Sequence, residues 1–582
     1  MARIVDLPYE LVILVIRHLL LDDIYSLALA CKRFLFLIGE EKITKWLLQT
    51  RAPFSAEAIE AQQTGKYARQ LRRLLKRREA IITVSPFLVA SVAYAHEWRY
   101  ANGVLCYTRG TKLHVLDLHR STKSQVLIDM KALIHDQLGA WHQGQKYGFE
   151  ILHYSDSIVS LLYKQAVPGL PGHAIYWLLV LTVSDQQLTG YHQLPSVSNI
   201  VVRNNQRFLY YGTTSDPNDE GDEFWKIGLF DIHDKKWYRQ ELLEEAIGTD
   251  LGSTVCFEIF DNDLYILSSQ RRMYVEYQGR GQQDRESQWE SYYFCGRYSP
   301  GPDHDGYFTI LRAEHPPDRT LWRRNHKQEG PLDNRGSSLC LVRNETTGQL
   351  QAIECRQEYL PGSASTKRTY YTTPIEFGGS ENAADQAALA PRIPRNPHLV
   401  QPCNDTSAIS IPLSRRLVCS YHPGCQAFID LVDTSDLFEP EARRLCIRGG
   451  SRRLGPSGEQ YEDRPTIFWP PEPGPEGHDA AALAALFRVL NPPGFSGKPF
   501  GSFDDRSMVY SAGTSKAGLH ALILISWDPA IHLPGTRAYR GLGISRDKPE
   551  KTATIEYYRI SKQGRWGGRQ LQDALVQLQA LS

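Results

Sequence analysis

Several features that would place a chain of 582 residues in a familiar class are missing from this one. Its 66 basic and 65 acidic residues nearly cancel to a net charge of +1, so overall charge predicts neither nucleic acid nor an anionic membrane as a partner. No stretch of about 18 uncharged apolar residues occurs. The apolar N-terminal run is interrupted by Arg17 and His18, so we expect neither a transmembrane helix nor a signal peptide.

The ten cysteines are too scattered to indicate a metal site or a disulfide framework. No Cys-x-x-Cys pair occurs, and the closest pair, Cys419 and Cys425, has neither a second pair nor a histidine cluster to complete a zinc site. We therefore expect buried free thiols in a reducing compartment, cytoplasmic and/or nuclear.

Motifs of metalloproteases, nucleotide-binding proteins and serine hydrolases are also missing. The sequence contains no His-Glu-x-x-His, no Gly-x-x-x-x-Gly-Lys-Ser/Thr and no Gly-x-Ser-x-Gly. Residues 494–498 resemble a phosphate loop only until Pro499, and the acidic segment 216–223 lacks the ligand spacing of a calcium loop. We therefore expect no catalytic residue, no metal and no cofactor.

The N-terminus contains a series of short amphipathic helices. Pro8 stands where a first-turn proline removes no hydrogen bond, and apolar residues at three- and four-residue steps from Leu11 to Leu19 form one stripe. Three further apolar residues fall off that stripe: Ile13, Leu14 and Leu20. Apolar residues on more than one face of a short helix indicate partners on more than one side.

A second helix is expected after Asp22 and Asp23, either of which can cap its first turn. Its apolar stripe continues to Cys31, and Gly39 ends this region. The next apolar face belongs to a short third helix and contains Ile43, Trp46 and Leu47. Three short helices in about 45 residues bury too little surface to be stable alone, so we expect them to dock on a partner.

Residues 4–50 resemble an F-box. The resemblance is carried by Leu7-Pro8-Tyr9-Glu10, the apolar first helix, and a second half running from Asp23-Ile24 through Leu27 to Cys31-Lys32-Arg33-Phe34. Leu21 departs from the pattern, since many members have proline there. Members of this family bind a Skp-type adaptor protein, which connects them to a cullin ubiquitin ligase. The implied adaptor contacts are Leu7, Pro8, Leu11, Val15, Ile16, Leu19, Ile24, Leu27 and Cys31, with Phe34 in support. The alternative is an ordinary three-helix cap on a larger domain.

Residues 51–82 are expected to form a basic helical linker. Leu71, Leu74 and Leu75 share one helical face, and seven basic residues between 66 and 78 cover the others. The pattern favours a solvated basic face on a helix whose leucines pack on the following domain. A nuclear-localisation or nucleic-acid-binding patch is the alternative.

Residues 83–582 have the texture of an all-β domain. Short runs of β-branched and aromatic residues alternate with turn residues. Four apolar strands carry an Asp at or near their end, at Asp117, Asp231, Asp430 and Asp528. The numbers of residues between successive members of this set are close to multiples of about 50, the repeat length of β-propeller blades. Coincidence could also produce four such matches. We expect six to eight blades, with loop insertions near 361–405 and 449–505.

The whole chain is therefore predicted to be an α+β protein with a small helical F-box and a large all-β domain. No WD or kelch signature repeats, and the segments 505–510 and 521–529 resemble the C-terminal end of a large group of F-box proteins from filamentous fungi. This resemblance implies a non-enzymatic target-recognition subunit of a Skp–cullin–F-box ubiquitin ligase, holding a target protein on the β domain. Two alternatives stay open: an F-box scaffold that acts without ubiquitination, and a propeller hydrolase with a helical cap.

Overall fold

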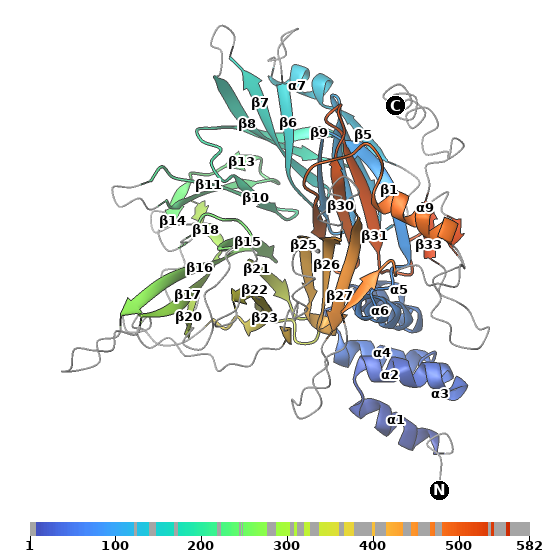
Figure 1. Cartoon of the computed structure of the whole chain (residues 1–582). Coiled ribbons are helices and arrows are strands. Elements are labelled where there is room, and N and C mark those ends of the chain that lie inside the picture. The colour runs from blue at the N-terminus through green and yellow to red at the C-terminus, as the bar shows by residue number, and fades with distance from the viewer. Residues whose placement is uncertain are drawn as a thin grey trace, which may run out of the picture.

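The structure is a computed structural model that describes residues 7–120, 125–138, 147–167, 173–217, 223–243, 246, 248–275, 287–302, 308–310, 319–325, 337–359, 366–377, 399–401, 415–434, 444–451, 466–471, 480–533, 537–539 and 555–558. Within these ranges a helical unit is followed by a β-propeller, which confirms the predicted α+β organisation (Figure 1). Residues 4–6, at the start of the predicted F-box, lie outside the described part.

Six helices precede the propeller. They are α1 (Tyr9–His18), α2 (Leu21–Ala30), α3 (Lys32–Leu37), α4 (Glu41–Arg51), α5 (Ala56–Thr64) and α6 (Tyr67–Ile82). The short α3 was not predicted, and α4 is the expected third helix. Asp22 and Asp23 were wrongly predicted as caps: Leu20 is the cap residue of α2, and both aspartates lie in its first turn, where a carboxylate still favours the positive helix end.

Seven sheets in the described part of the chain form the blades, six of them antiparallel and the seventh mixed, within the predicted range of six to eight. The first blade contains β2 (Glu97–Ala101), β3 (Val104–Arg109), β4 (Lys112–Asp117) and β5 (Val126–Asp129). The second contains β6 (Tyr147–Ser155), β7 (Ile158–Ala166), β8 (Ala174–Thr182) and β9 (Gln187–Leu194). The third contains β10 (Val201–Asn204), β11 (Phe208–Thr214), β12 (Trp225–Asp231) and β13 (Lys236–Trp237), and β14 (Glu241–Leu243) also pairs with β12.

The fourth blade contains β15 (Val255–Phe260), β16 (Asp263–Val275), β17 (Ser287–Tyr298) and β20 (Arg319–Asn325). The fifth contains β21 (Ser338–Arg343), β22 (Leu350–Tyr359), β23 (Thr366–Pro374) and β24 (Leu399–Gln401). The sixth contains β25 (Arg415–His422), β26 (Ala427–Asp433), β27 (Leu445–Ser451) and β28 (Ile467–Trp469). Smaller elements are the hairpin β18 (Pro300–Pro302) and β19 (Phe308–Ile310), the 3₁₀ turn η3 (Pro423–Cys425), α7 (Met130–Leu138) and α9 (Ala480–Leu490).

The seventh blade closes the ring with strands from both ends of the propeller sequence. It combines β29 (Phe500–Phe503), β30 (Ser507–Thr514) and β31 (His520–Ser526) with β1 (Leu88–Ala95). β1 runs antiparallel to β31, with Leu88 opposite Ser526 (Figure 1). The outer strands β32 (Arg537–Tyr539) and β33 (Ile555–Tyr558) extend this sheet. Residues far apart in sequence thus hold the ring together through one backbone ladder.

The hydrophobic core is divided into layers between neighbouring blades. Each of the seven layers is an apolar cluster with residues from two adjacent sheets; Cys106 and Leu179, for example, belong to the layer between the first two blades. An eighth cluster joins the N-terminal helices. Blade strands are buried on both faces, which explains why most of them read as continuous apolar runs without clear alternation.

The predicted role of aspartate at strand ends holds at three of four positions. Asp117 accepts a hydrogen bond from the Arg120 amide (2.9 Å), Asp231 accepts from the amides of the two residues after Ile232 (3.0 Å each), and Asp528 accepts from the Ala530 amide (2.9 Å). Asp430 was wrongly grouped with them, because it lies inside β26, a second strand, and pairs with arginines.

The segments expected as loop insertions contain blade strands. β23 and β24 lie within 361–405, and the end of β27 with β28, α9 and β29 lies within 449–505. The remaining residues of both segments are largely outside the described ranges. β23 was missed because its threonines and tyrosines are interspersed with lysine and arginine, which hides their high β-propensity behind low hydrophobicity.

The interblade layers should be sensitive to truncation. Ile525 is fully buried between the last two blades, so Ile525→Ala should lower the free energy of unfolding by about 2–5 kcal/mol through the cavity that it leaves. Leu251→Ala, at a side chain that is 43% exposed, should change it by less than about 0.5 kcal/mol. Urea unfolding followed by tryptophan fluorescence measures both, and equal effects would contradict the layered core.

Candidate docking site and its junction with the propeller

The helices α1–α4 enclose their own small core. Val12 and Ile16 of α1, Ile24 of α2 and Phe34 of α3 are all 1–2% exposed. They pack with Leu47 and further apolar residues of α4 in the same cluster. The middle of the predicted stripe therefore faces inward at Val12 and Ile16, as amphipathic packing requires, whereas Leu11 at its start is exposed.

A second set of apolar side chains on these helices faces solvent. It consists of Tyr9, Leu11, Leu14, Leu20, Leu29, Leu35 and Phe36. The largest exposed fractions are 77% for Phe36 and 63% for Leu29. Single exposed apolar residues are ordinary on protein surfaces, but seven within 28 positions are typical of an interaction surface; six lie on three short helices and Leu20 lies at the N-cap of α2. We call these seven residues the apolar docking face.

The ten predicted adaptor contacts divide into three groups. Pro8 and Leu11 are exposed; Ile16, Ile24 and Phe34 are buried in the helical core; the remaining five are partly exposed, namely Leu7, Val15, Leu19, Leu27 and Cys31. The three buried residues are unavailable for direct contact while the helices keep this packing, because each lies in the core cluster of the N-terminal helices.

Most of the exposed set was left out of the predicted contacts. Leu14 and Leu20 carried a signal, since they fall off the core stripe and so require a different partner. Leu35 and Phe36 carried the same signal, but it was hidden because α3 was not recognised as a separate helix. Leu29 lies on the predicted second helix, α2, off its buried stripe. Apolar residues off the inward stripe were the better indicators of a docking face than the stripe itself.

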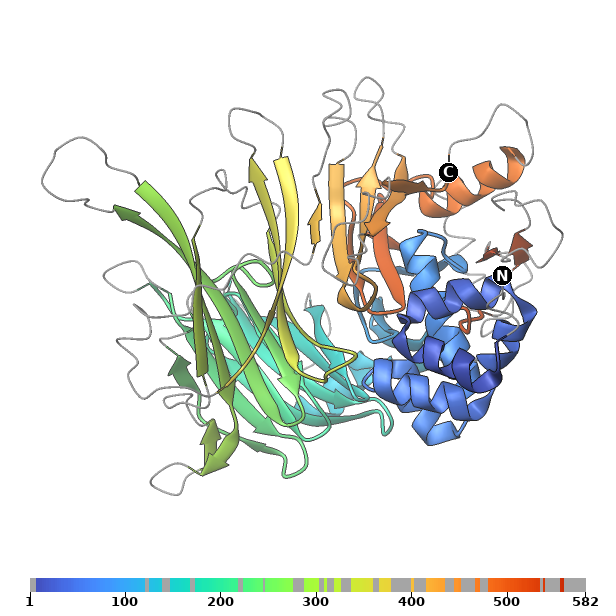
Figure 2. The same ribbon diagram turned by 90° about the horizontal axis from the view of Figure 1, so that it is seen from below.

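The predicted packing of the leucines on the basic linker helix is wrong. Leu71, Leu74 and Leu75 pack into the core of the N-terminal helices, not onto the following domain. The other end of α6 enters the propeller, where Ile81 and Ile82 join the layer between the last two blades. A single helix thus belongs to both cores, and Figure 2 shows the helices lying beside the orange and red blades.

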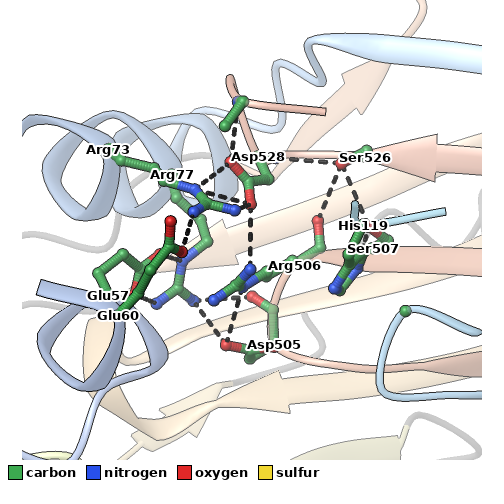
Figure 3. A network of polar contacts seen from close by, with 12 residues as sticks. Glu57, Glu60, Arg73, Arg77, His119, Asp505, Arg506, Ser507, Ser526 and Asp528 are labelled. Atoms are coloured by element: carbon green, nitrogen blue, oxygen red, sulfur yellow. Dashed lines mark hydrogen bonds and ion pairs between the residues drawn. The ribbon is translucent and has the colours of Figure 1, made fainter. Parts of the chain in front are cut away.

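Three arginines of α6 also face inward, which overturns the prediction of a solvated basic face for them. Arg73 forms a two-pronged contact with Asp528, from Nε to Oδ1 (2.8 Å) and from Nη2 to Oδ2 (2.6 Å), and its Nη1 reaches Glu60 (2.6 Å) (Figure 3). Asp528 is fully buried and Arg73 is only 10% exposed. This pair therefore connects α5 and α6 to the last blade with little screening by water.

Arg77 and Arg78 extend the network to two more turns of the propeller. Arg77 pairs with Glu57 through two contacts of 2.8 and 2.9 Å, and its Nη1 donates to the carbonyl of Asp505 (2.7 Å). Arg78 lies 3.2 Å from Asp22 of α2. Glu345, in the turn between β21 and β22, lies 3.5 Å from Arg77 and 3.7 Å from Arg78. The junction therefore joins α2, α5 and α6 to the fifth and seventh blades.

The charges of the junction keep both partners ionised. Burial alone would raise the pKa of Asp528, but its hydrogen bonds with Arg73 and the charges of Arg73 and Arg506 hold that pKa below its ordinary value. Burial disfavours the charged form of Arg73, yet Asp528 and Glu60 outweigh it and raise the Arg73 pKa. Removing either partner would leave a buried charge without its counterion.

Behind the junction, Ser507, His119 and Asp504 lie close together without the geometry of a hydrolase. The His119 Nε2 atom lies 3.2 Å from Ser507 Oγ and 3.4 Å from Asp504 Oδ2, so one ring nitrogen faces both neighbours. A catalytic triad uses the two ring nitrogens separately. Ser507 is also fully buried and donates to Ser526 Oγ (3.2 Å). Asp504 accepts from Tyr100 and from the Gly103 amide, so this group joins the first and last blades.

The two cysteines closest in sequence lie in different elements, Cys419 on β25 and Cys425 in η3. None of the nine cysteines in the described ranges is in a disulfide bond. No group of three His, Cys, Asp or Glu side chains suited to a metal ion occurs among the residues that the structure covers. In the same residues, no helix combines the length and apolarity that crossing a membrane requires.

Loss of the Asp528 carboxylate should weaken the junction. Asp528→Asn leaves Arg73 largely buried without its main counterion, which should lower the free energy of unfolding by about 3–5 kcal/mol. Asp234→Asn is the control, because Asp234 is 58% exposed and pairs with exposed His233; it should cost less than about 0.5 kcal/mol. Urea unfolding of both variants measures the difference, and a mild effect of Asp528→Asn would contradict the junction.

The contribution of Asp528 should also depend on pH in a defined direction. Its folded pKa lies below the value of about 3.9 expected in the unfolded chain, so the carboxylate stabilises the folded chain above that pH. This contribution is lost as the pH falls through the lower, folded pKa. The stability difference between wild type and Asp528→Asn should therefore be complete at neutral pH and shrink below about pH 4. A difference that stays constant in unfolding measurements down to acid pH would refute this.

No protein-family model matches the chain, and no curated protein matches it. Among solved structures it is similar to the tricorn protease, at 8% identity over 65% of this chain and 34% of that chain with a TM-score of 0.23. It is also similar to prolyl oligopeptidase B from Galerina marginata, at 9% identity over 79% of this chain and 51% of that chain with a TM-score of 0.30. The β-propeller domain of the Trilobed protease from Pyrococcus furiosus aligns at 9% identity over 60% of this chain and 91% of that domain, with a TM-score of 0.23. Similarity this distant assigns no activity to the chain.

Proposed function

We propose that this chain is a target-recognition subunit of a Skp–cullin–F-box ubiquitin ligase and binds the Skp-type adaptor through the apolar docking face. The observation that carries the proposal is the exposure of seven apolar side chains on α1–α3, helices whose own core is already filled by a different set. Burying such side chains in a partner is favourable, at about 25 cal/mol per Å² of apolar surface. The F-box resemblance of the same segment supports the choice of adaptor.

In this role the chain needs no catalytic group of its own. The propeller would hold a target protein while α1–α3 hold the adaptor and, through it, the cullin. Keeping the target beside the ubiquitin-charged enzyme raises the effective concentration of its lysines, which accelerates transfer without chemistry in this chain. The buried junction supports this role because it fixes the docking helices to the propeller.

The helices leave much of the platform available. α6 contacts β26, β27 and η3, and its arginines reach turns of the fifth and seventh blades. The turns at Glu345 and Asp505 each connect the first strand of a blade to the second, so both lie on one face of the ring. A target would bind the opposite face or the blades that lie away from the helices.

Adaptor binding should depend on the exposed residues of α1. Leu11→Asp/Leu14→Asp places charges on side chains that are 45% and 48% exposed, so the fold should persist while adaptor recovery in a pull-down falls by about tenfold or more. Leu251→Asp, at a comparably exposed propeller residue, is the control and should leave recovery unchanged. Unchanged recovery with the α1 variant would sink the proposal.

A second measurement separates a ligase subunit from a scaffold. With the wild-type chain in cells, blocking cullin activation should make a bound target accumulate if the complex ubiquitinates it. Adaptor binding without any accumulating partner would favour the scaffold.

A further inference from the structure

Helix α6 carries two sets of basic residues with different environments. Arg73, Arg77 and Arg78 point into the junction, where all three pair with carboxylates. The remaining four basic residues of this segment are exposed: Arg69, Arg72 and Lys76 on the helix, and Lys66 at its N-cap. We call these four residues the basic stripe. The junction explains the first set, but not the second.

The basic stripe follows one line on the helix surface. Its members are separated by three, three and four residues, so they lie above one another on successive turns. At a rise of 1.5 Å per residue the stripe is about 15 Å long. Among the described residues, none of its members forms an ion pair; the Arg72 Nε atom donates only to the carbonyl of Ala68 (3.2 Å).

The fold gains nothing from this arrangement. Like charges three and four residues apart on a helix repel one another, so the stripe weakens α6 when no anion is present. The apolar face of α6 already supplies its contacts with both cores. The repulsion within the stripe therefore destabilises α6 in the isolated chain, and a bound anion would relieve that repulsion.

We propose that the basic stripe is a docking surface for an acidic segment of another protein, with carboxylates at matching helical spacing. Among the described residues no carboxylate forms an ion pair with the stripe, and four guanidinium or ammonium groups in line complement Asp and Glu side chains on successive turns of a partner helix. This surface goes beyond the proposed adaptor site, since it shares no residue with the apolar docking face.

Nucleic acid fits the stripe less well than an acidic protein segment. A length of about 15 Å reaches few phosphates, whereas phosphate-driven binding commonly uses six to ten contacts. The aromatic ring next to the stripe, Tyr67, is covered by the Lys45 ammonium 5.5 Å from its centre, and single strands need free aromatic rings for stacking.

The test uses the full-length chain and a fluorescent helical peptide with glutamates at steps of three and four residues. Wild type should bind it in an anisotropy titration, with affinity falling as NaCl rises. Arg69→Gln/Arg72→Gln/Lys76→Gln should weaken binding about tenfold or more, because three surface ion pairs are lost. The control, Lys226→Gln/Lys235→Gln/Arg239→Gln, removes the same charge from exposed residues of the third blade and should bind like wild type.

Two further measurements distinguish a loss of peptide binding by the stripe variant from a folding defect. Removing like charges from α6 should leave the thermal midpoint of the stripe variant unchanged or slightly higher, and its recovery of adaptor intact. Equal peptide affinity for the stripe variant and the control variant, or no binding by wild type, would overturn the proposal. Tighter, stripe-dependent binding of a single-stranded RNA than of the peptide would also overturn it, in favour of nucleic acid.

Discussion

The ion pairs that α6 makes with the propeller are the constraint on which the arrangement of this molecule depends. Its leucines lie in the core of the N-terminal helices, Ile81 and Ile82 lie between two blades, and Arg73 reaches the buried carboxylate of Asp528. Arg73, Arg77 and Arg78 are largely buried where α6 enters the two cores. Carboxylates from four separate parts of the chain, namely α2, α5 and the fifth and seventh blades, compensate the burial of these charges, and they also fix the direction in which the docking helices leave the ring.

This constraint links the two halves of the proposed role. A subunit that brings a target to an enzyme works best when the distance between its two binding surfaces is restricted, because effective concentration depends on that geometry. Here the apolar docking face belongs to helices that are attached to the platform through buried charges and not through an exposed linker. Acid would weaken the attachment through Asp528, while salt would act mainly on exposed charges such as those of the basic stripe.

Much of this architecture could be predicted from local sequence patterns. The apolar stripe of α1, the propeller texture and the turn role of Asp117 and Asp231 all follow from side-chain periodicity and turn chemistry, which act over a few residues. The junction could not be predicted in this way. Arg73 and Asp528 are 455 positions apart, and an arginine that will be buried looks the same in sequence as one that will be solvated.

The candidate site shows the same limit on a smaller scale. Ile16, Ile24 and Phe34 follow the F-box-like pattern, yet the helices pack them inside, while Phe36, on the same helix as Phe34, is exposed.

The proposal of adaptor binding through α1–α3 is tested most directly by hydrogen–deuterium exchange of the full-length chain with and without a Skp-type adaptor. We predict slower exchange in α1–α3 on adaptor binding and unchanged exchange in the blades away from the helices. Protection of the propeller blades, with α1–α3 unchanged, would contradict it.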